Sequence, residues 1–417
     1  MTSVARNDNC KASSTGLLES SFPVTQATPA KPRKGPSRKF DSVPLLDLQR
    51  QYKQIREEVL AAIERVCATQ QFALGAEVET FEREIAAFIG TSAAVGCASG
   101  TDALWLALLV AGVQPGDPVI TTAFSFFASA SSVVRAGARP VFVDIDPETL
   151  NIDPRCVREE LTAGRNKARI MLPVHLYGQC ADMDALQPIV DEFDLTVVED
   201  TAQAIGAKWR DRNAGSLGAT AAFSFYPTKN LSAYGEAGLV TTSNLGMAQR
   251  VRNLRNQGSP RRYHHEEIGW NCRMDAIQAA VLRVKLPHVE RWNQQRREHA
   301  AHYDRLLTSA GFGSGGSSPL RRLLVSPGAY HVFHQYVIRV ERRDQLRAFL
   351  TERKIGTEVY YPLPLHLQPC LAYLGYSQGD LPESERAARE VLALPMFPEL
   401  TEDEQGWVVE SIAEFFS

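Results

Sequence analysis

Short apolar runs alternate with longer amphipathic segments along the chain from Val43 onward. Residues 49–68 and 75–90 carry apolar side chains at the three- and four-residue spacing of a helix, and the second segment ends on Gly90, a typical helix stop. Short β-rich runs and further amphipathic helices then alternate as far as residue 243. We predict these elements over 93–112, 117–145, 168–178, 182–194, 195–203, 221–226 and 237–243.

This alternation predicts an α/β fold. Short strands that are apolar throughout and separated by helices are typical of a mainly parallel sheet covered by helices on both faces. Ligands of such sheets bind at the carboxyl ends of the strands. Polar residues directly follow several predicted strands, as in "VVEDTAQA" (197–204) and "FSFYPTKN" (223–230). We therefore expect the functional site at this edge of the sheet.

The pattern changes near Pro287. A long helix is predicted over 274–307, and a Gly- and Ser-rich loop follows over 309–319. Residues 331–340 alternate like a strand, and residues 343–356 have helical spacing. This order of elements predicts a smaller α+β domain from about Pro287 to the C-terminus.

The N-terminal segment differs from the rest. Residues 1–40 are rich in Ser, Thr, Pro, Ala and basic residues and poor in aromatic ones. Such a segment cannot bury enough apolar surface to order itself, and it lacks the hydrophobic stretch of a secretory signal. We expect a disordered extension or a misplaced start, with a transit peptide as the less favoured alternative. The predicted domains are then a large one over 41–286 and a small one over 287–417.

Composition narrows the class of protein. Of the 417 residues, 44% are hydrophobic and 22% are charged, which is ordinary for a soluble globular protein. The net charge of −3 gives no electrostatic footprint for nucleic acid, and no apolar run approaches the length of a membrane span. The seven cysteines are scattered without a CxxC pair. We expect free thiols in the cytoplasm, and neither disulfides nor a metal site.

The stretch "ASGTDAL" (98–104) joins a predicted strand to an apolar helix. A helix N-terminus presents free backbone N–H groups, so Ser99, Gly100 and Thr101 can hold a phosphate there. Taken alone, this stretch is more simply interpreted as a plain capped helix.

Two charged residues follow predicted strands. Asp200 ends a strand that should be buried, where an unpaired carboxylate is costly; it is either functional or, equally well, the cap of the next helix. Lys229 follows the run 221–225 and Pro227, with no acid beside it. A solvated loop lysine is the ordinary interpretation. A lysine at a desolvated strand end, however, loses its proton more easily and can form a Schiff base.

Together with Phe126, whose ring is either core packing or a flat face for a ligand ring, these features describe one chemistry. Pyridoxal phosphate needs a lysine for its aldehyde and an acid that keeps its pyridine nitrogen protonated. It also needs a phosphate cradle and a surface for its ring. The protonated pyridine draws electrons from a Cα–H bond, and the lysine, once substrate has replaced it, is well placed to move that proton.

From about Val43 to the C-terminus the chain resembles the DegT/StrS-type sugar aminotransferases, which have the aspartate-aminotransferase fold (fold type I). The matching motifs, in order, are "PLLDLQRQY", "FALGAEVETFEREIAAFIG", "SGTDAL", "PVHLYGQCADMDAL", "VVEDTAQAIGA", "FSFYPTKNLSAYGEAG", "GWNCRMDAIQAAVLRVKL" and "ALPMFPELTEDE". The resemblance implies a large domain with a mainly parallel sheet, a smaller C-terminal α+β domain, and pyridoxal 5'-phosphate as cofactor.

The resemblance also implies roles for single residues. Lys229 would carry the internal aldimine, and Asp200 would bind the pyridine nitrogen. The other implied cofactor contacts are Gln203 near the ring hydroxyl, Phe126 stacked on the ring, and Gly100, Thr101 and Ser224 around the phosphate. Asn271 in "GWNCRM" would reach the phosphate of a neighbouring subunit, which implies a homodimer with shared active sites.

Two departures from the family pattern are visible. Tyr226 stands where histidine is common, and "EAG" (236–238) replaces a more usual acid–Gly–Gly. We expect the first to tune the site without abolishing it. Some relatives carry histidine in place of the lysine and act as dehydratases. Because Lys229 is present, the resemblance favours transamination over a dehydratase or a non-catalytic regulator on the same fold.

The substrate implied by the family is a keto-sugar carried on a nucleoside diphosphate, aminated with L-glutamate as donor. Residues 255–286 are more similar to the subgroup that acts at C3 than to the C4 enzymes, which remain the alternative. The basic and aromatic stretch 261–265 suits a diphosphate and a sugar or base, although an ordinary exposed loop is an equal interpretation. The candidate substrate contacts are Tyr263, His264, Tyr361 and His366. The product would be an amino-sugar nucleotide for polysaccharide, lipopolysaccharide or natural-product glycan synthesis.

Overall fold

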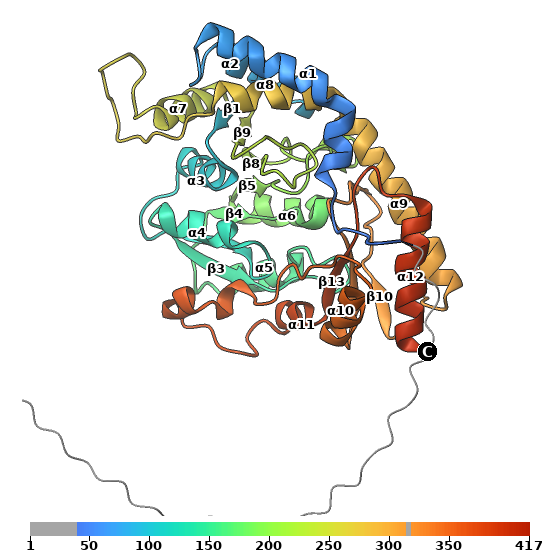
Figure 1. The fold of residues 1–417 in the computed structure, drawn as a ribbon. Coiled ribbons are helices and arrows are strands. Elements are labelled where there is room, and N and C mark those ends of the chain that lie inside the picture. The colour runs from blue at the N-terminus through green and yellow to red at the C-terminus, as the bar shows by residue number, and fades with distance from the viewer. Residues whose placement is uncertain (1–39, 314–317) are drawn as a thin grey trace, which may run out of the picture. The chain divides into compact units, whose positions relative to one another are not determined.

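A seven-stranded sheet with the strand order β1-β9-β8-β5-β4-β2-β3 runs through the fold (Figure 1). The computed structural model describes residues 40–313 and 318–417. The strands of this sheet are β1 (Ala93–Cys97), β2 (Pro118–Thr122), β3 (Arg139–Val143), β4 (Ile170–Leu172), β5 (Thr196–Asp200), β8 (Thr220–Ser224) and β9 (Gly238–Thr242). Apart from Phe40, the extension predicted over residues 1–40 lies outside the described residues.

Strand direction confirms the predicted mainly parallel sheet. The pairs β2–β3, β2–β4, β4–β5 and β5–β8 are parallel, whereas β9 runs antiparallel to both β8 and β1. The carboxyl ends of the parallel strands therefore meet at one edge, and Asp200 at the end of β5 lies beside Ala222 of β8.

Helices cover both faces of the sheet, which explains why its strands are apolar throughout. On one face, α3 (Gly100–Val110), α4 (Phe127–Arg135) and α7 (Leu245–Arg255) share a buried cluster with alternate strand residues. On the other face lie α5 (Pro154–Thr162) and α6 (Met183–Phe193), and, around β8 and β9, α2 (Ala76–Ile89) and α8 (Ala276–Lys285). Helix α1 (Leu48–Thr69) packs on α8.

The long helix predicted over 274–307 is interrupted. Proline lacks the N–H that an α-helix needs, and its ring clashes with the preceding turn. At Pro287 the chain therefore forms a 3₁₀ turn (Leu286–His288) between α8 and α9 (Val289–Ser309). Helix α9 then turns away from α8 toward the C-terminal part of the fold (Figure 1).

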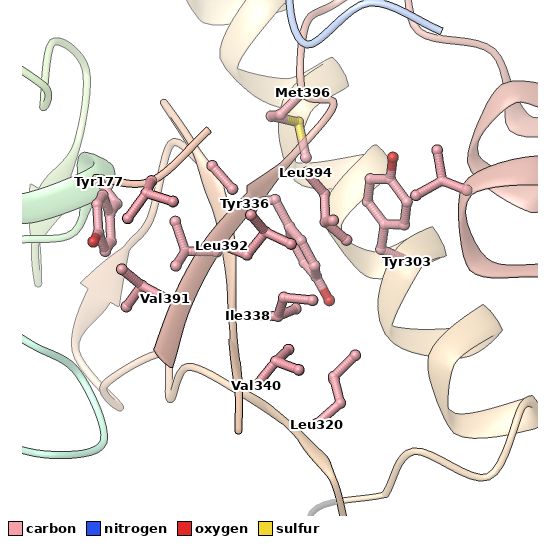
Figure 2. Packing of buried hydrophobic residues seen from close by; sticks show 14 of the residues in the cluster. Tyr177, Tyr303, Leu320, Tyr336, Ile338, Val340, Val391, Leu392, Leu394 and Met396 are labelled. Carbon is pink, nitrogen blue, oxygen red and sulfur yellow. The ribbon is translucent and has the colours of Figure 1, made fainter. Parts of the chain in front are cut away.

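A second, three-stranded sheet belongs to the C-terminal part. It consists of β10 (Leu320–Arg322), β12 (Tyr336–Val340) and β13 (Val391–Leu394), all antiparallel. Helices α9, α10 (Arg343–Glu352) and α12 (Glu402–Phe416) share its core. In that core Tyr303 of α9 lies 4.9 Å from Tyr336, ring centre to ring centre, beside Leu394 and Met396 (Figure 2).

The strand predicted over 331–340 begins only at Tyr336. Residues 331–335 form a tight loop instead, in which Phe333 has a φ of +44°. Arg296 of α9 donates from Nη1 to the carbonyl oxygens of Phe333 and His334, at 3.2 Å each. Because these carbonyls bind a helix side chain, they are unavailable for strand pairing.

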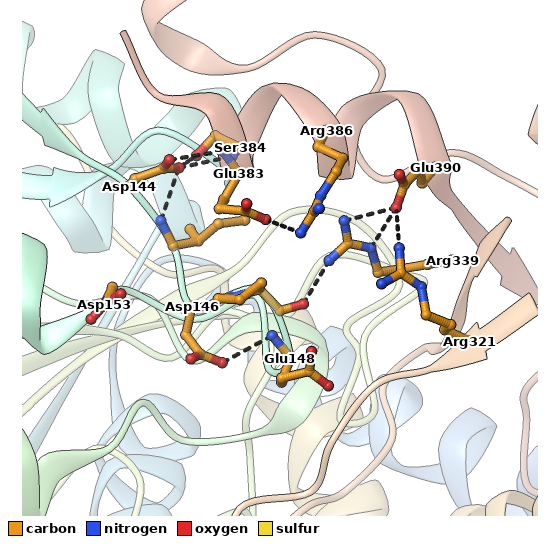
Figure 3. Close-up of polar contacts among 12 residues, drawn as sticks. Asp144, Asp146, Glu148, Asp153, Arg321, Arg339, Glu383, Ser384, Arg386 and Glu390 are labelled. Carbon is orange, nitrogen blue, oxygen red and sulfur yellow. Dashed lines mark hydrogen bonds and ion pairs between the residues drawn. The ribbon is translucent and has the colours of Figure 1, made fainter. Parts of the chain in front are cut away.

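Polar contacts fix helix α11 (Pro382–Glu390) between the two sheets (Figure 3). Asp144, which follows β3, accepts the backbone N–H groups of Glu383 and Ser384, both at 2.8 Å, at the start of α11. At the other end of the helix Glu390 accepts from Nε of Arg339 on β12, at 2.8 Å. Carboxylates at a helix N-terminus and buried charge-assisted bonds are both stabilising.

Residues 40–417 pack as one unit. The first of them lie with the C-terminal part: Val43 forms a parallel bridge with Ile355, and the carbonyl of Leu45 accepts from the N–H of Met396 at 3.1 Å. The division at residues 286 and 287 stays a prediction. A small sheet is formed by β6 (Lys208–Trp209), β7 (Arg212–Asn213) and β11 (Ala329–Tyr330).

Two sequence expectations concern membranes and thiols. No helix within the described ranges combines the length and the apolar character needed to cross a membrane. The cysteines in those ranges are free thiols, as predicted, whereas Cys10 lies outside them.

Candidate active site

Lys229 and Asp200 come from neighbouring parallel strands and face one cavity. Asp200 is the last residue of β5, and Lys229 lies in the turn that follows the end of β8 at Ser224. The turn is closed by its own backbone: the N–H of Lys229 donates to the carbonyl of Tyr226 at 2.8 Å, and that of Ala233 donates to Phe225 at 2.8 Å. The lysine is thus held by local structure and not by a solvated loop.

The cavity has a volume of about 610 Å³. It brings together most of the residues that the sequence singled out. Those that line it are Ser99, Gly100, Thr101, Phe126, Asp200, Gln203, Ser224, Tyr226, Lys229 and Tyr361. The predicted position of the site, at the carboxyl ends of the parallel strands, is where this cavity lies.

Asp200 is buried and held by hydrogen bonds. Its Oδ2 accepts from the hydroxyl of Ser129 at 2.7 Å, and its Oδ1 accepts from the N–H of Ala202 at 3.1 Å. Burial raises the pKa of this carboxyl, while these two donors and the charge of Lys229 act against that rise. Ser129, on the first turns of α4, was missed by sequence reasoning because a helix serine carries no signal of its own.

The amine of Lys229 is easily deprotonated. Burial lowers its pKa from 10.5 to about 8, and the nearby charge of Asp200 raises it only in part. Near neutral pH the amine of Lys229 is therefore deprotonated in a larger fraction of molecules than an ordinary lysine would be, and the deprotonated amine is the nucleophilic form.

The N-terminus of α3 closes one end of the cavity. Ser99 caps the helix by accepting the N–H of Asp102 at 3.1 Å. The N–H groups of Gly100 and Thr101 belong to the first turn, which has no acceptor within the helix. A Cβ at Gly100 would lie 2.5 Å from Cβ of Ser224, so only glycine allows the helix end to approach β8 this closely. These donors and the Ser224 hydroxyl fit a phosphate group.

Phe126 is not a core residue. Its side chain is 56% exposed at the start of α4, and its ring lies 5.9 Å from that of Tyr361. Gln203 is fixed at both ends of its amide: Oε1 accepts from the N–H of Tyr177 at 2.6 Å, and Nε2 donates to the hydroxyl of Tyr361 at 3.1 Å. An exposed aromatic face therefore lies in the cavity with the lysine and the aspartate.

Other sequence candidates lie elsewhere. Tyr263 and His264 are exposed on the segment between α7 and α8, which extends away from the sheets (Figure 1) and does not line the cavity. Asn271, at the end of that segment, is exposed too. His366 is buried, and its Nε2 lies 3.2 Å from Oε1 of Glu385 outside the cavity. Its motif "YYPLPLH" therefore brings only Tyr360 and Tyr361 to the cavity.

Several residues of the cavity wall were not predicted, among them Arg296, His334 and Gln335. Arg296 lies on α9, and the other two lie in or beside the loop 331–335 that the sequence pattern made part of a strand. The prediction of a strand over 331–340 gave no indication that His334 would face a cavity.

The fold and the site define a pyridoxal-phosphate-dependent aminotransferase of fold type I. The residues present fit the cofactor, since an amine, a buried carboxylate, an aromatic face and a phosphate cradle meet in one cavity. The chain belongs to the DegT/DnrJ/EryC1/StrS aminotransferase family, whose sequence model matches residues 53–413.

Similar proteins support this assignment. The chain is 52% identical over 379 residues to a "Pleiotropic regulatory protein" of Geobacillus stearothermophilus, covering 90% of this chain and 99% of the relative. It is 43% identical over 373 residues to a "dTDP-3-amino-3,4,6-trideoxy-alpha-D-glucose transaminase" of Streptomyces venezuelae, covering 89% and 96%. The crystal structure of S. venezuelae DesV in complex with a ketimine intermediate superposes with a TM-score of 0.85 at 43% identity, covering 90% of this chain and 98% of that one.

Proposed function

We propose that the enzyme transfers the amino group of L-glutamate to a keto-sugar carried on a nucleoside diphosphate, at C3 of the sugar. The observation that carries the transaminase chemistry is the shared cavity of Lys229, Asp200 and the α3 N-terminus. The position on the sugar is supported by the S. venezuelae relative, whose name specifies a 3-amino product. The product is an amino-sugar nucleotide for glycan synthesis.

In this proposal each wall of the cavity has one task. The amine of Lys229 binds the aldehyde of the cofactor, and Asp200 keeps the pyridine nitrogen protonated. The N–H groups of Gly100 and Thr101 and the hydroxyl of Ser224 hold the phosphate. When bound, the cofactor supplies the electron sink that makes a Cα–H bond acidic.

The chain's own residues then orient the reactants and move the proton. Nζ of Lys229, with its pKa lowered to about 8, accepts the proton from one carbon and returns it to another. The exposed face of the Phe126 ring stacks on the pyridine ring of the cofactor, and Gln203 lies near the cofactor's ring hydroxyl. Tyr361, tied to Gln203, contacts the substrate at the mouth of the cavity.

We further propose a homodimer with shared sites. Asn271 is exposed and away from the cavity of its own chain, so a partner's cavity is the place where it can bind phosphate. The exposed Tyr263 and His264 would reach the partner's substrate from the same segment. We retain no substrate role for His366. The free thiols suit the cytoplasm.

A regulator without activity is the alternative favoured by the name of the Geobacillus relative. The two candidates differ in the fate of the bound cofactor. A transaminase loaded with pyridoxal phosphate is yellow and is bleached by L-glutamate, whereas a regulator or dehydratase is not bleached.

The decisive experiment combines that assay with a panel of keto-sugar nucleotides. The enzyme bleached by L-glutamate should regain its colour when a 3-keto sugar nucleotide is added, with formation of the amino sugar. Lys229→Ala is the matched control and should do neither. Recovery with 4-keto sugars alone would replace C3 by C4, and no bleaching of the loaded enzyme would reject transamination.

A further inference from the structure

A series of hydrogen bonds between buried side chains starts at Asn230, the residue after Lys229, and involves His334 and Asn293. Nδ1 of His334 lies 2.9 Å from Oδ1 of Asn230, Nδ2 of Asn230 lies 2.8 Å from Oδ1 of Asn293, and Nδ2 of Asn293 lies 2.9 Å from the carbonyl oxygen of Ile205. His334, Asn230 and Asn293 are all buried. The proposed function assigns no role to these three residues.

The carbonyl oxygen of Ile205, at one end of this series, determines which atoms donate and which accept. A carbonyl oxygen can only accept, so Asn293 donates to Ile205 from Nδ2 and accepts at Oδ1. Asn230 then donates from Nδ2 and accepts at Oδ1; its second contact, from Nδ2 to the carbonyl of Val332 at 3.4 Å, gives the same orientation. The proton of His334 must therefore sit on Nδ1.

His334 is consequently a neutral imidazole with a lone pair on Nε2. Burial lowers its pKa well below 6.5, and the charges of Lys229 and Arg296 lower it further. The other charged residues that line the cavity are Asp200, which acts on Lys229, and Glu236. Among the described residues Nε2 has no hydrogen-bond partner, and His334 lines the cavity. Nε2 is not among the buried polar atoms that lack a partner, so it is open to the cavity, where an N–H group of a ligand can donate to it.

We propose that His334 positions the reacting amine: its Nε2 accepts a hydrogen bond from Nζ of Lys229 or from the amino group of the incoming donor. Transamination exchanges these two amines at one place, so one acceptor serves both. A neutral acceptor orients an ammonium group without adding a second positive charge beside Lys229. The inference rests on the proposed transaminase function and adds a residue to its machinery.

Two substitutions separate this role from a structural one. In His334→Asn the amide nitrogen can keep the bond to Asn230 that Nδ1 makes, but nothing replaces Nε2. In His334→Gln the longer side chain can place an acceptor where Nε2 was, but the bond to Asn230 is lost. His331→Asn is the control, because His331 is buried in the same loop, stacks on Phe333 at 3.9 Å and does not line the cavity.

The first measurement is a pH titration of the near-visible absorbance of the cofactor-loaded enzyme without amino donor. A hydrogen bond to a charged group contributes about 1.5–3 kcal/mol, which corresponds to a shift of about one to two pH units. Loss of the acceptor disfavours the protonated amine, so we expect the pH midpoint of the absorbance change to fall by about one unit in His334→Asn. The midpoint should stay near the parent value in His334→Gln and in His331→Asn. This result would mean that Nε2 of His334 binds Nζ of Lys229.

The second measurement is the rate of bleaching by L-glutamate. If the acceptor serves only the incoming amine, the midpoint stays and the rate falls about tenfold in His334→Asn, with His334→Gln closer to the parent. If the pH midpoint and the bleaching rate of His334→Asn both equal those of the parent enzyme, the proposal is wrong. It is also wrong if either quantity changes more in His334→Gln than in His334→Asn. If the parent enzyme is not bleached, the proposed function fails, and the titration still tests His334.

A measurement on the parent protein covers the case in which the variants do not fold. With ¹⁵N-labelled histidine we expect His334 to carry its proton on Nδ1 and none on Nε2, and the Nε2 resonance to move when L-glutamate binds. A proton on Nε2, or a resonance that does not respond in either the cofactor-loaded or the donor-bound enzyme, overturns the proposal.

Discussion

Two desolvated lysines show that a lowered pKa alone does not mark a site. Lys229 and Lys285 both have a pKa lowered to about 8 by desolvation. Lys285 points at the ring of Tyr234, 4.6 Å from its centre, and donates to the hydroxyl of Ser232 at 2.9 Å. Lys229 instead faces a cavity with a carboxylate. The surroundings of the amine, and not its pKa, separate the lysine that we propose to be reactive from the structural one.

Lys285→Met should stabilise the protein near neutral pH. Between about pH 8 and 10.5 the unfolded chain holds a proton on Lys285 that the folded chain releases, so the stability of the parent rises with pH in that window. The pKa difference corresponds to about 3 kcal/mol; the lost ring contact and hydroxyl bond reduce the gain to about 1–2 kcal/mol at pH 7. Urea unfolding of both proteins at pH 7 and pH 10 measures this. A variant less stable at both pH values would contradict the prediction.

Asp200→Asn should separate cofactor binding from chemistry. The amide has the shape of the carboxyl group but cannot hold the proton on the pyridine nitrogen by charge. Turnover should fall by orders of magnitude while the cofactor is still retained. Transaminase rates and cofactor content after gel filtration test this. Ser129→Ala is the graded control, since it removes one donor to Asp200 and leaves the charge. Within the described chain no helix directly follows β5, so Asp200 is not the helix cap that the sequence allowed. Near-normal turnover of Asp200→Asn would mean that its carboxylate only stabilises the turn through the N–H of Ala202.

At the scale of elements, the site depends on how closely a helix end approaches a strand. Helix α3 begins against Ser224 of β8, and Gly100 is the residue that permits the contact. Gly238 serves the same packing from β9, where a Cβ would lie 2.1 Å from the carbonyl oxygen of Ser99. The proposed phosphate cradle thus depends on packing between elements as much as on a sequence motif.

Gly100→Ala should loosen the cradle. Its Cβ would overlap Ser224, and overpacking of this kind costs about 1–3 kcal/mol. We expect lower stability and weaker retention of the cofactor. The control is Gly406→Ala on α12, where a Cβ meets nothing within 4 Å, and where alanine should stabilise the helix by about 0.5–1 kcal/mol. Thermal unfolding and cofactor content after dialysis distinguish the two. Parent-like cofactor retention in Gly100→Ala would remove this helix end from the phosphate site.

At the scale of the whole molecule, the proposed homodimer concerns Asn271, which is exposed and does not line the cavity of its own chain. A two-fold axis would complete two identical sites through one interface. The same segment carries Tyr263, which is 78% exposed.

Mixing two inactive variants tests this assembly. In a mixed dimer of Lys229→Ala and Asn271→Asp chains, one site combines an intact Lys229 with an intact Asn271. At equal mixing with free exchange about half of the dimers are mixed, and each regains one of its two sites, so activity should recover to about a quarter of the parent value. The measurement needs subunit exchange confirmed by mass labelling. Absence of recovery, with both single variants inactive, would mean that each chain builds its site alone.

The sequence by itself determined the α/β class, the mainly parallel sheet and the positions of Lys229, Asp200 and the α3 N-terminus, because strand periodicity and strand-end chemistry are local signals. Tertiary structure alone decided which helix serine holds Asp200, that His366 turns to Glu385, and that residues 331–335 leave the strand pattern to bring His334 to the cavity. These outcomes depend on contacts between segments far apart in the chain, such as Arg296 with the carbonyl of His334. Residue patterns report burial and turn chemistry, but not which distant donor reaches which acceptor.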